Sequence, residues 1–197
     1  MSDEVTMATI CSMIQGCGPF NQFKVDTSKS KAFPPSREMK VGVLTFTAPA
    51  AGVSKESPYG PAGAYTTPEN VGITAANAVS SELVNVPNII LIERPRVEEI
   101  LKEHKLSLSG EAHGPDVKVL GQILPVDALI FGNVTTFQRW HDMAGHGGIV
   151  AYSARLMNIH TAEVLFSMSC NAVKRGGMPE KIVIDLSRDA IKKLLVK

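Results

Sequence analysis

The chain has 197 residues, 44% of them hydrophobic, which is enough apolar material for one folded core. Its 20 Lys and Arg residues are mixed with 19 Asp and Glu residues, so the net charge is only +1. A balanced charge provides no field to attract a polyanion, and we expect no nucleic-acid partner. The sequence also holds no run of the roughly 18 to 20 apolar residues that a membrane-spanning helix requires.

The N-terminal 37 residues differ in composition from the rest. Residues 5–14 are mainly apolar, and after Cys17 the chain is rich in Ser, Lys and Pro up to residue 37. This layout is typical of a secretory signal that leaves a lipid-bearing cysteine, here Cys17, at the start of a flexible spacer. The acidic residues 3–4 depart from that pattern, because a signal begins with positive charge. The alternative is a frayed N-terminal segment or a shortened signal.

We expect the folded domain to cover residues 38–197 and to begin with a strand over 40–47, a β-branched and aromatic run. Residues 48–67 are dense in Gly, Pro and Ala and form a predicted loop of about twenty residues, far longer than the usual four to six. Long loops are often functional. Tyr59 and Tyr65 are therefore candidate partner contacts, with packing of the loop onto its own domain as the alternative.

Two helices and a strand are predicted next. Thr66 and Glu69 stand three residues apart around a proline, which indicates a helix that starts there and ends near residue 84. Residues 88–93 contain a continuous apolar run, Ile89 to Ile92, and suit a strand buried on both faces. A second helix is expected from Pro95, with its charged residues in solvent.

A third short helix is predicted over residues 115–124, followed by three antiparallel strands. The strands are expected over 127–138, 149–159 and 163–173, because their apolar and polar residues alternate with period two. A Gly-rich turn over 141–148 joins the first two, and a tight turn at 160–162 joins the last two. Cys170 falls on the apolar side and is expected to be a buried hydrophobe.

A last helix begins at Pro179, with apolar residues on one side and charged residues on the other. The predicted order of elements is β-α-β-α-α-β-β-β-α. This order favours an α/β fold with a mixed sheet and helices packed against it.

Four segments resemble the curli-secretion component (CsgG) family. They are Glu93-Arg94 with residues 97–103, Leu120-Gly121, residues 128–134, and the hairpin over 154–165, where Ala162 replaces the usual turn glycine. The resemblance implies a non-enzymatic envelope lipoprotein, with an α/β domain related to the lipoprotein activators of penicillin-binding proteins and to the N-terminal domain of TolB. Cys17 would then match the acylated cysteine.

One feature of that family is missing from the sequence. The curli secretion pore uses two membrane-spanning hairpins, whereas the corresponding segments here, 139–148 and 174–178, are shorter than two membrane strands of about 9 to 11 residues. The chain therefore resembles the soluble core of the family without its pore, and we do not carry over a role in curli secretion.

The residues provide no nucleophile with a base and an orienting group at a recognisable spacing, so we expect no enzyme and no cofactor. His141 and His146 are weak metal-ligand candidates in the Gly-rich turn, beside Trp140, a further candidate partner contact. The sequence thus favours a periplasmic protein tethered to the outer membrane of a Gram-negative bacterium, acting as a scaffold through contacts with envelope proteins or with itself. The alternative is a ligand- or metal-binding module that uses the 140–148 turn or the 48–67 loop.

Overall fold

A computed structural model of the chain describes residues 21–54, 64–103, 120, 122–142 and 145–196. Its elements follow one another as β1 (Asn21–Lys29), β2 (Met39–Val43), β3 (Gly52–Ser54), β4 (Ala64–Thr67), α2 (Val71–Leu83), β5 (Ile89–Ile92), α3 (Arg94–Glu103), β6 (Ala128–Asp142), β7 (Gly145–Asn158), β8 (Val164–Arg175) and α5 (Pro179–Leu195). Most of the predicted third helix lies outside the described residues.

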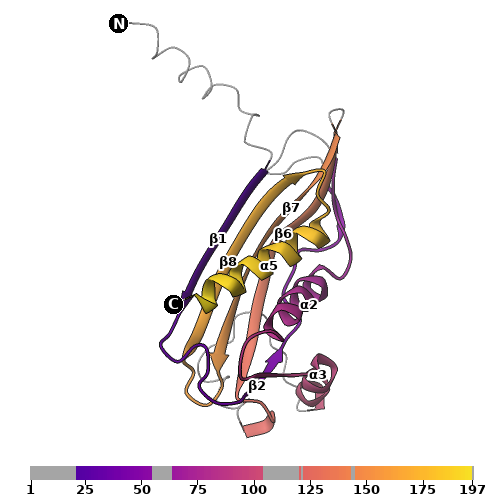
Figure 1. Cartoon of the computed structure of the whole chain (residues 1–197). Coiled ribbons are helices and arrows are strands. Elements are labelled where there is room, and N and C mark those ends of the chain that lie inside the picture. The colour runs from indigo at the N-terminus through magenta and orange to yellow at the C-terminus, as the bar shows by residue number, and fades with distance from the viewer. Residues whose placement is uncertain (1–20, 55–63, 104–119, 121, 143–144, 197) are drawn as a thin grey trace, which may run out of the picture.

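All described strands belong to one eight-stranded sheet (Figure 1). Its main path runs β1-β8-β7-β6-β2-β5, antiparallel from β1 to β6 and parallel from β6 to β5. The β3–β4 hairpin joins the far end of β6, on the same side as β2. The predicted α/β fold with a mixed sheet is confirmed, while the order of elements gains three strands, β1, β3 and β4.

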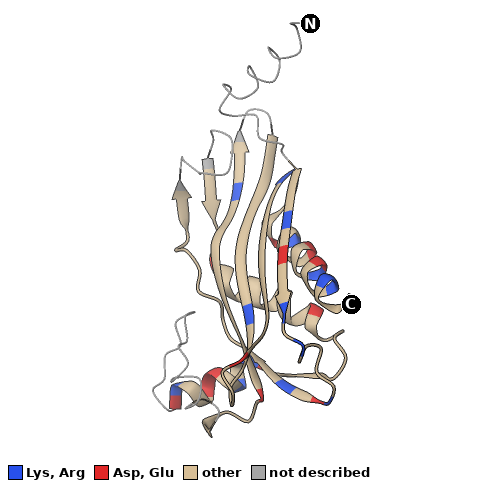
Figure 2. Cartoon of the chain, turned by 90° about the vertical axis from the view of Figure 1, so that its left-hand side faces the viewer, with Lys and Arg blue, Asp and Glu red and all other residues tan. Residues whose placement is uncertain are grey.

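The helices cover the two faces of the sheet unequally. α2 and α5 pack side by side on one face and form the main core with alternate residues of β2, β6, β7 and β8. α3 packs on the opposite face at one end only, where Val97 and Leu101 meet Leu129 and Phe131. The rest of that second face is uncovered by any described helix (Figure 2).

β1 corrects the prediction of a flexible spacer. Residues 21–29 pair with β8 along their whole length, from Asn21 opposite Lys174 to Lys29 opposite Phe166. The strand lies at the outer margin of the sheet and most of its side chains are exposed. Backbone hydrogen bonds hold such a strand with little help from apolar side chains, so its sequence lacks the alternation that marks a strand.

The hairpin between β6 and β7 is tighter than predicted. The two strands continue to Asp142 and from Gly145, so the glycines of the expected turn lie inside β7. Gly147 is needed for packing, because a Cβ there would come within 2.5 Å of the Trp140 indole and of the Lys174 carbonyl oxygen. The tight turn before β8 is confirmed, and Ala162 adopts there the positive φ of 60° that a glycine would.

Two further predictions need correction. α2 begins at Val71 and not at residue 66, because Thr66 lies in β4 and pairs with Val53. Asn70 precedes the helix with a φ of 57° and no side-chain cap. β5 is an outer strand of the sheet and not one buried on both faces, since Ile90 keeps 39% of its surface exposed. Sheet order, which decides this burial, is not encoded in the composition of one strand.

Candidate functional site

Tyr65 and Trp140 lie next to each other on paired strands. They are register partners on β4 and β6, and their exposed fractions are 1% and 2%. With Ile149 they form a small apolar cluster at the end of the sheet where β4 pairs with β6. Both candidate contact residues are thus packed inside the chain. Tyr59 and Cys17 lie outside the described residues.

His141 and His146 face each other across the β6–β7 hairpin. They are direct register partners, and both side chains are exposed. Directly opposite residues of an antiparallel pair have Cβ atoms about 4.5 to 5.5 Å apart, which suits two ligands of one ion. Among the described residues, however, no group of three or more His, Cys, Asp or Glu side chains converges.

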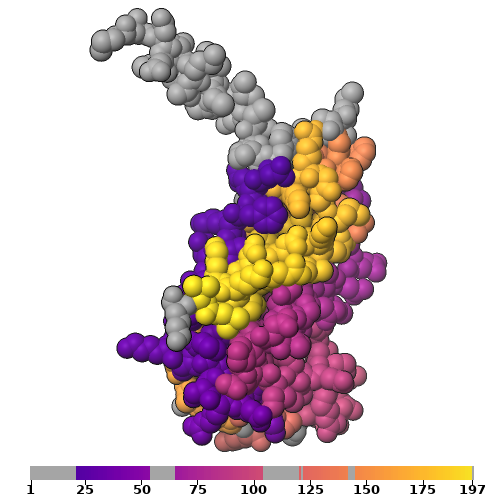
Figure 3. Space-filling view, viewed as in Figure 1, coloured from indigo at the N-terminus to yellow at the C-terminus, as the bar shows by residue number. Residues whose placement is uncertain are grey.

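The two outer strands of the main sheet are β1 and β5, at opposite margins. β1 runs along the surface beside α5 (Figure 3). Just after β1, the Ser30 N–H donates to the carbonyl of Leu165 on β8, so the backbone polar groups of Ser30 point toward β8. Because backbone direction alternates along a strand, the polar groups of Val25 and Thr27 point away from β8. The Lys193 ammonium donates to the Val25 carbonyl at 2.7 Å, which agrees with this direction.

A cavity of about 570 Å³ lies at the carboxyl ends of the parallel strands β2 and β5, between α2 and α3. Ligands of open α/β sheets often bind at this position. Two of its charged groups, Arg94 and Glu98, already have partners within the chain. Arg94 donates to the Val43 carbonyl at 3.3 Å and to Asn77 Oδ1 at 2.8 Å, and Glu98 accepts from Thr45 Oγ1 at 2.6 Å. Burial lowers the pKa of Arg94, while the nearby Glu98 raises it. Arg94 and Glu98 of α3 therefore link α3 to α2 and to the end of β2 through hydrogen bonds across the cavity.

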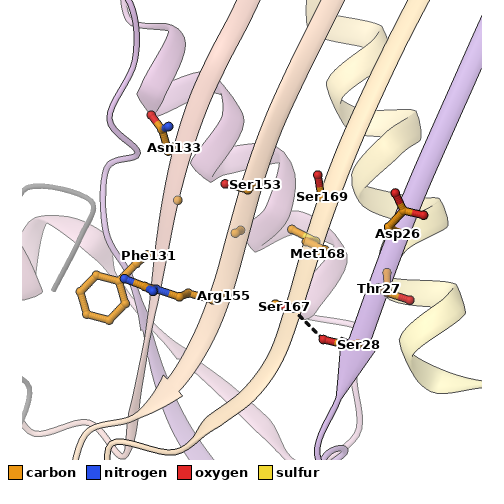
Figure 4. Close-up of a pocket in the computed structure, with 12 residues that line it drawn as sticks. Asp26, Thr27, Ser28, Phe131, Asn133, Ser153, Arg155, Ser167, Met168 and Ser169 are labelled. Atoms are coloured by element: carbon orange, nitrogen blue, oxygen red, sulfur yellow. Dashed lines mark hydrogen bonds between the residues drawn. The ribbon is translucent and has the colours of Figure 1, made fainter. Parts of the chain in front are cut away.

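A second cavity, of about 490 Å³, lies on the uncovered face of the sheet. It crosses β1, β8, β7 and β6 (Figure 4). Its polar lining residues are Asp26, Thr27, Ser28, Asn133, Ser153, Arg155, Ser167 and Ser169. The alternation of apolar and polar residues predicted from the sequence places polar side chains on this side of β8, but it did not identify a site. The signal in the sequence was the small polar residues at alternate positions of β8, such as Ser167 and Ser169. Such small side chains fill little space, so the face of the twisted sheet is hollow there.

Two ionisable groups in the core are held in their protonated forms. Burial is the main cause that raises the pKa of the Tyr152 phenol well above its ordinary value, and burial also raises the pKa of the Cys170 thiol to about 11. Both side chains lie under α5 in the main core. Neither group is placed to react with a bound molecule.

None of the described helices is long and apolar enough to cross a membrane.

Comparison with known proteins agrees with this architecture. The family model described as "Curli production assembly/transport component CsgG" matches residues 22–176, starting within β1. Among solved structures, the PelC dodecamer from Paraburkholderia phytofirmans is similar with a TM-score of 0.54 and 11% identity, over 89% of this chain and 99% of that one.

A second similar structure is the lipoprotein GNA1162 from Neisseria meningitidis, with a TM-score of 0.55 and 16% identity, over 79% of this chain and 97% of that one. Comparison with the curated proteins finds no match. The family model covers well over half of the sequence, and the chain belongs to the CsgG family.

Proposed function

We propose that this protein is a non-enzymatic accessory protein of the bacterial cell envelope that acts through protein–protein contacts, first of all with copies of itself. Its family and its similarity in fold to a dodecamer and to a lipoprotein support the proposal. The packed interior adds to this support, because the buried Tyr152 and Cys170 provide no accessible reactive group.

The observation that carries the proposal is the outer edge of β1, which pairs with no described strand other than β8. This strand is nine residues long and exposed, and β5 forms an outer strand at the opposite margin of the sheet. Two different edges on one molecule allow head-to-tail pairing of strands, which closes into a ring when the rotation permits. The Lys193 ammonium donates to the outward carbonyl of Val25, while the outward N–H of Thr27 has no partner among the described residues and could pair with a neighbouring strand.

Thr27→Pro tests this edge directly. Proline removes the outward N–H of residue 27 without removing a hydrogen bond to β8, and outer strands tolerate it. We expect the wild-type chain to form an oligomer of defined mass in light scattering, and Thr27→Pro to shift it to the monomer with an unchanged circular dichroism spectrum. Thr27→Ala keeps the N–H and is the matched control. A wild-type monomer, or an oligomer untouched by Thr27→Pro, would contradict the proposal.

We also propose that acylation of Cys17 tethers the protein to the outer membrane and faces it towards the periplasm. A thioether-linked lipid on the cysteine after residues 1–16 would place the folded domain a short spacer away from the membrane. Labelled fatty acid should enter the wild-type chain and a Cys11→Ala control in cells, but not Cys17→Ala. Equal labelling of Cys17→Ala would remove the tether while leaving the assembly proposal intact.

A second candidate function, metal binding, is favoured by the opposed pair His141 and His146. Two imidazoles hold a transition metal weakly unless further ligands join them. Calorimetry with Zn²⁺ and Ni²⁺ should then give heat for the wild type and for His160→Ala, an exposed histidine elsewhere, but none for His146→Ala. Equal heats for all three proteins would exclude the pair as the site.

A further inference from the structure

Arg155 is a charged residue without a counter-charge in the cavity on the uncovered sheet face. It lies on β7, is partly buried, and makes no hydrogen bond or ion pair with another described residue. Figure 4 shows its side chain extending from β7 toward the ring of Phe131 on β6. A guanidinium that has lost part of its hydration is stabilised by an anion that restores the lost hydrogen bonds.

Hydroxyl groups line the neighbouring strands of the same cavity, on the side of Arg155 away from Phe131 (Figure 4). Ser167 and Ser28 continue its row across β8 and β1, and their hydroxyls lie 2.8 Å apart. One proton serves that contact, so the other hydroxyl keeps a proton to donate. Ser153 and Ser169 form the next row, and their hydroxyls have no partner among the described residues.

The spacing of these rows fits one small ligand. Neighbouring strands lie about 4.8 Å apart, and residues two apart along a strand lie about 6.6 Å apart. Donors from Ser153, Ser167 and Ser169 can therefore reach a molecule that also contacts Arg155. The volume of about 490 Å³ falls within the range of about 300 to 1,000 Å³ that small-molecule sites occupy.

The charge of the cavity favours an anion. Its other charged residue, Asp26 on β1, is already paired with Lys24 at 3.1 Å. Arg155 is left as the unneutralised charge among the described lining residues. We propose that this cavity binds an oxyanion on Arg155, a phosphate or carboxylate carried by a small hydroxylated molecule whose other groups meet the serine hydroxyls and Asn133.

This site and the assembly proposed above use different groups, because the cavity uses side chains on the face of the sheet and the assembly uses the outward backbone groups of β1. An oligomer of unchanged mass in Arg155→Gln would show that independence. The two proposals can therefore fail separately.

Saturation-transfer NMR of the full chain tests the site, since it detects weak ligands through their own signals and needs no assignment of the protein's signals. The probes are glucose 6-phosphate, glucuronate and neutral glucose at constant ionic strength, because salt screens the interaction. We expect saturation transfer to one or both anionic sugars and none to glucose. Inorganic phosphate should displace glucose 6-phosphate, and acetate should displace glucuronate. The stronger of the two signals identifies phosphate or carboxylate as the preferred group.

Variants assign the signal to the cavity. Arg155→Gln should weaken binding roughly tenfold or more, as expected for loss of a charge-assisted pair. Arg96→Gln removes an exposed arginine on α3 and should bind like the wild type. Ser153→Asp provides a second test that leaves the partly buried arginine in place. Residue 153 is exposed on the same face of the sheet, and a carboxylate there should neutralise Arg155 and abolish binding. Transfer that persists in Arg155→Gln and Ser153→Asp, equal transfer to glucose, or no transfer to any probe would overturn the proposal.

Discussion

The phenol oxygen of Tyr152 lies 2.7 Å from the Ser187 hydroxyl oxygen, inside the core between β7 and α5. Ser187 donates its single proton to the Val183 carbonyl at 2.8 Å. Tyr152 must therefore be the donor in the contact between sheet and helix. This hydrogen bond fixes the position of α5 along the sheet, which apolar contacts alone specify less sharply.

A double-mutant cycle measures that bond. Tyr152→Phe should lower the free energy of unfolding by about 1 kcal/mol, and Ser187→Ala by about 1 to 2 kcal/mol because it leaves a buried phenol without its oxygen acceptor. The coupling energy between the two substitutions should be about 0.5 to 1.5 kcal/mol in urea unfolding. Strictly additive effects would mean that the contact adds no stability.

The Cys170 thiol predicts a loss of stability in alkali. Burial raises its pKa from 9.0 to about 11, so the unfolded chain loses this proton at a lower pH than the folded chain. The contribution is complete below pH 9 and is lost as the pH rises toward 11, by about 2 to 3 kcal/mol at about 1.4 kcal/mol per pKa unit.

The raised pKa of Tyr152 acts in the same direction. Urea unfolding at several pH values between 8 and 11 should therefore show a falling free energy of unfolding. Cys170→Ala should reduce the slope, whatever its effect on stability at pH 8. An identical slope in both proteins would show that the thiol titrates alike in the folded and unfolded chains.

Gly147→Ala should disturb the Trp140 cluster. The added methyl group would meet the indole and the Lys174 carbonyl at 2.5 Å, and we expect a loss of about 1 to 3 kcal/mol, as for other overpacked sites. The chain has one tryptophan, so its fluorescence reports on Trp140 alone. Gly52→Ala is the control, because nothing lies within 4 Å of its would-be Cβ. An unchanged emission spectrum of Gly147→Ala would contradict the packing described above.

Ala162→Gly should stabilise the protein. Ala162 holds a φ of 60°, a left-handed conformation that costs a residue with a Cβ roughly 1 to 2 kcal/mol. Glycine relieves this cost but gives the unfolded chain more freedom, so the net gain should be about 0.5 to 1 kcal/mol. Ala151→Gly, within β7, should instead destabilise the protein. Thermal unfolding of both variants provides the comparison.

Much of the fold could be predicted where side-chain patterns repeat. The β6–β7–β8 meander follows from period-two alternation, and α5 follows from its apolar stripe, since the buried Ile182, Leu186 and Ala190 lie on one side. The tight turn before β8 was also predicted, because it separates two such runs. Loops and edges were predicted poorly. The segment 48–67 includes β3 and β4, whose short strands are held by pairing with each other and with β6.

The candidate site was harder to predict than the fold. Sequence reasoning selected aromatic residues and histidines in Gly-rich segments as candidates, yet Tyr65 and Trp140 are buried against each other. Arg155 was part of a family-like motif and had no assigned role. Only the register of three strands, β7, β8 and β1, places it in one row with Ser167 and Ser28, and Ser28 is distant from both along the chain.

The sequence by itself determined the α/β class, the three long antiparallel strands and the resemblance to the CsgG family, because these depend on local alternation and short motifs. Tertiary structure alone decided that residues 21–29 form an outer strand, that Gly147 makes room for Trp140, and that polar residues of four strands share one cavity. These features depend on which segments become neighbours in space. Backbone pairing and packing between distant residues set that arrangement, and neither leaves a mark in a single stretch of sequence.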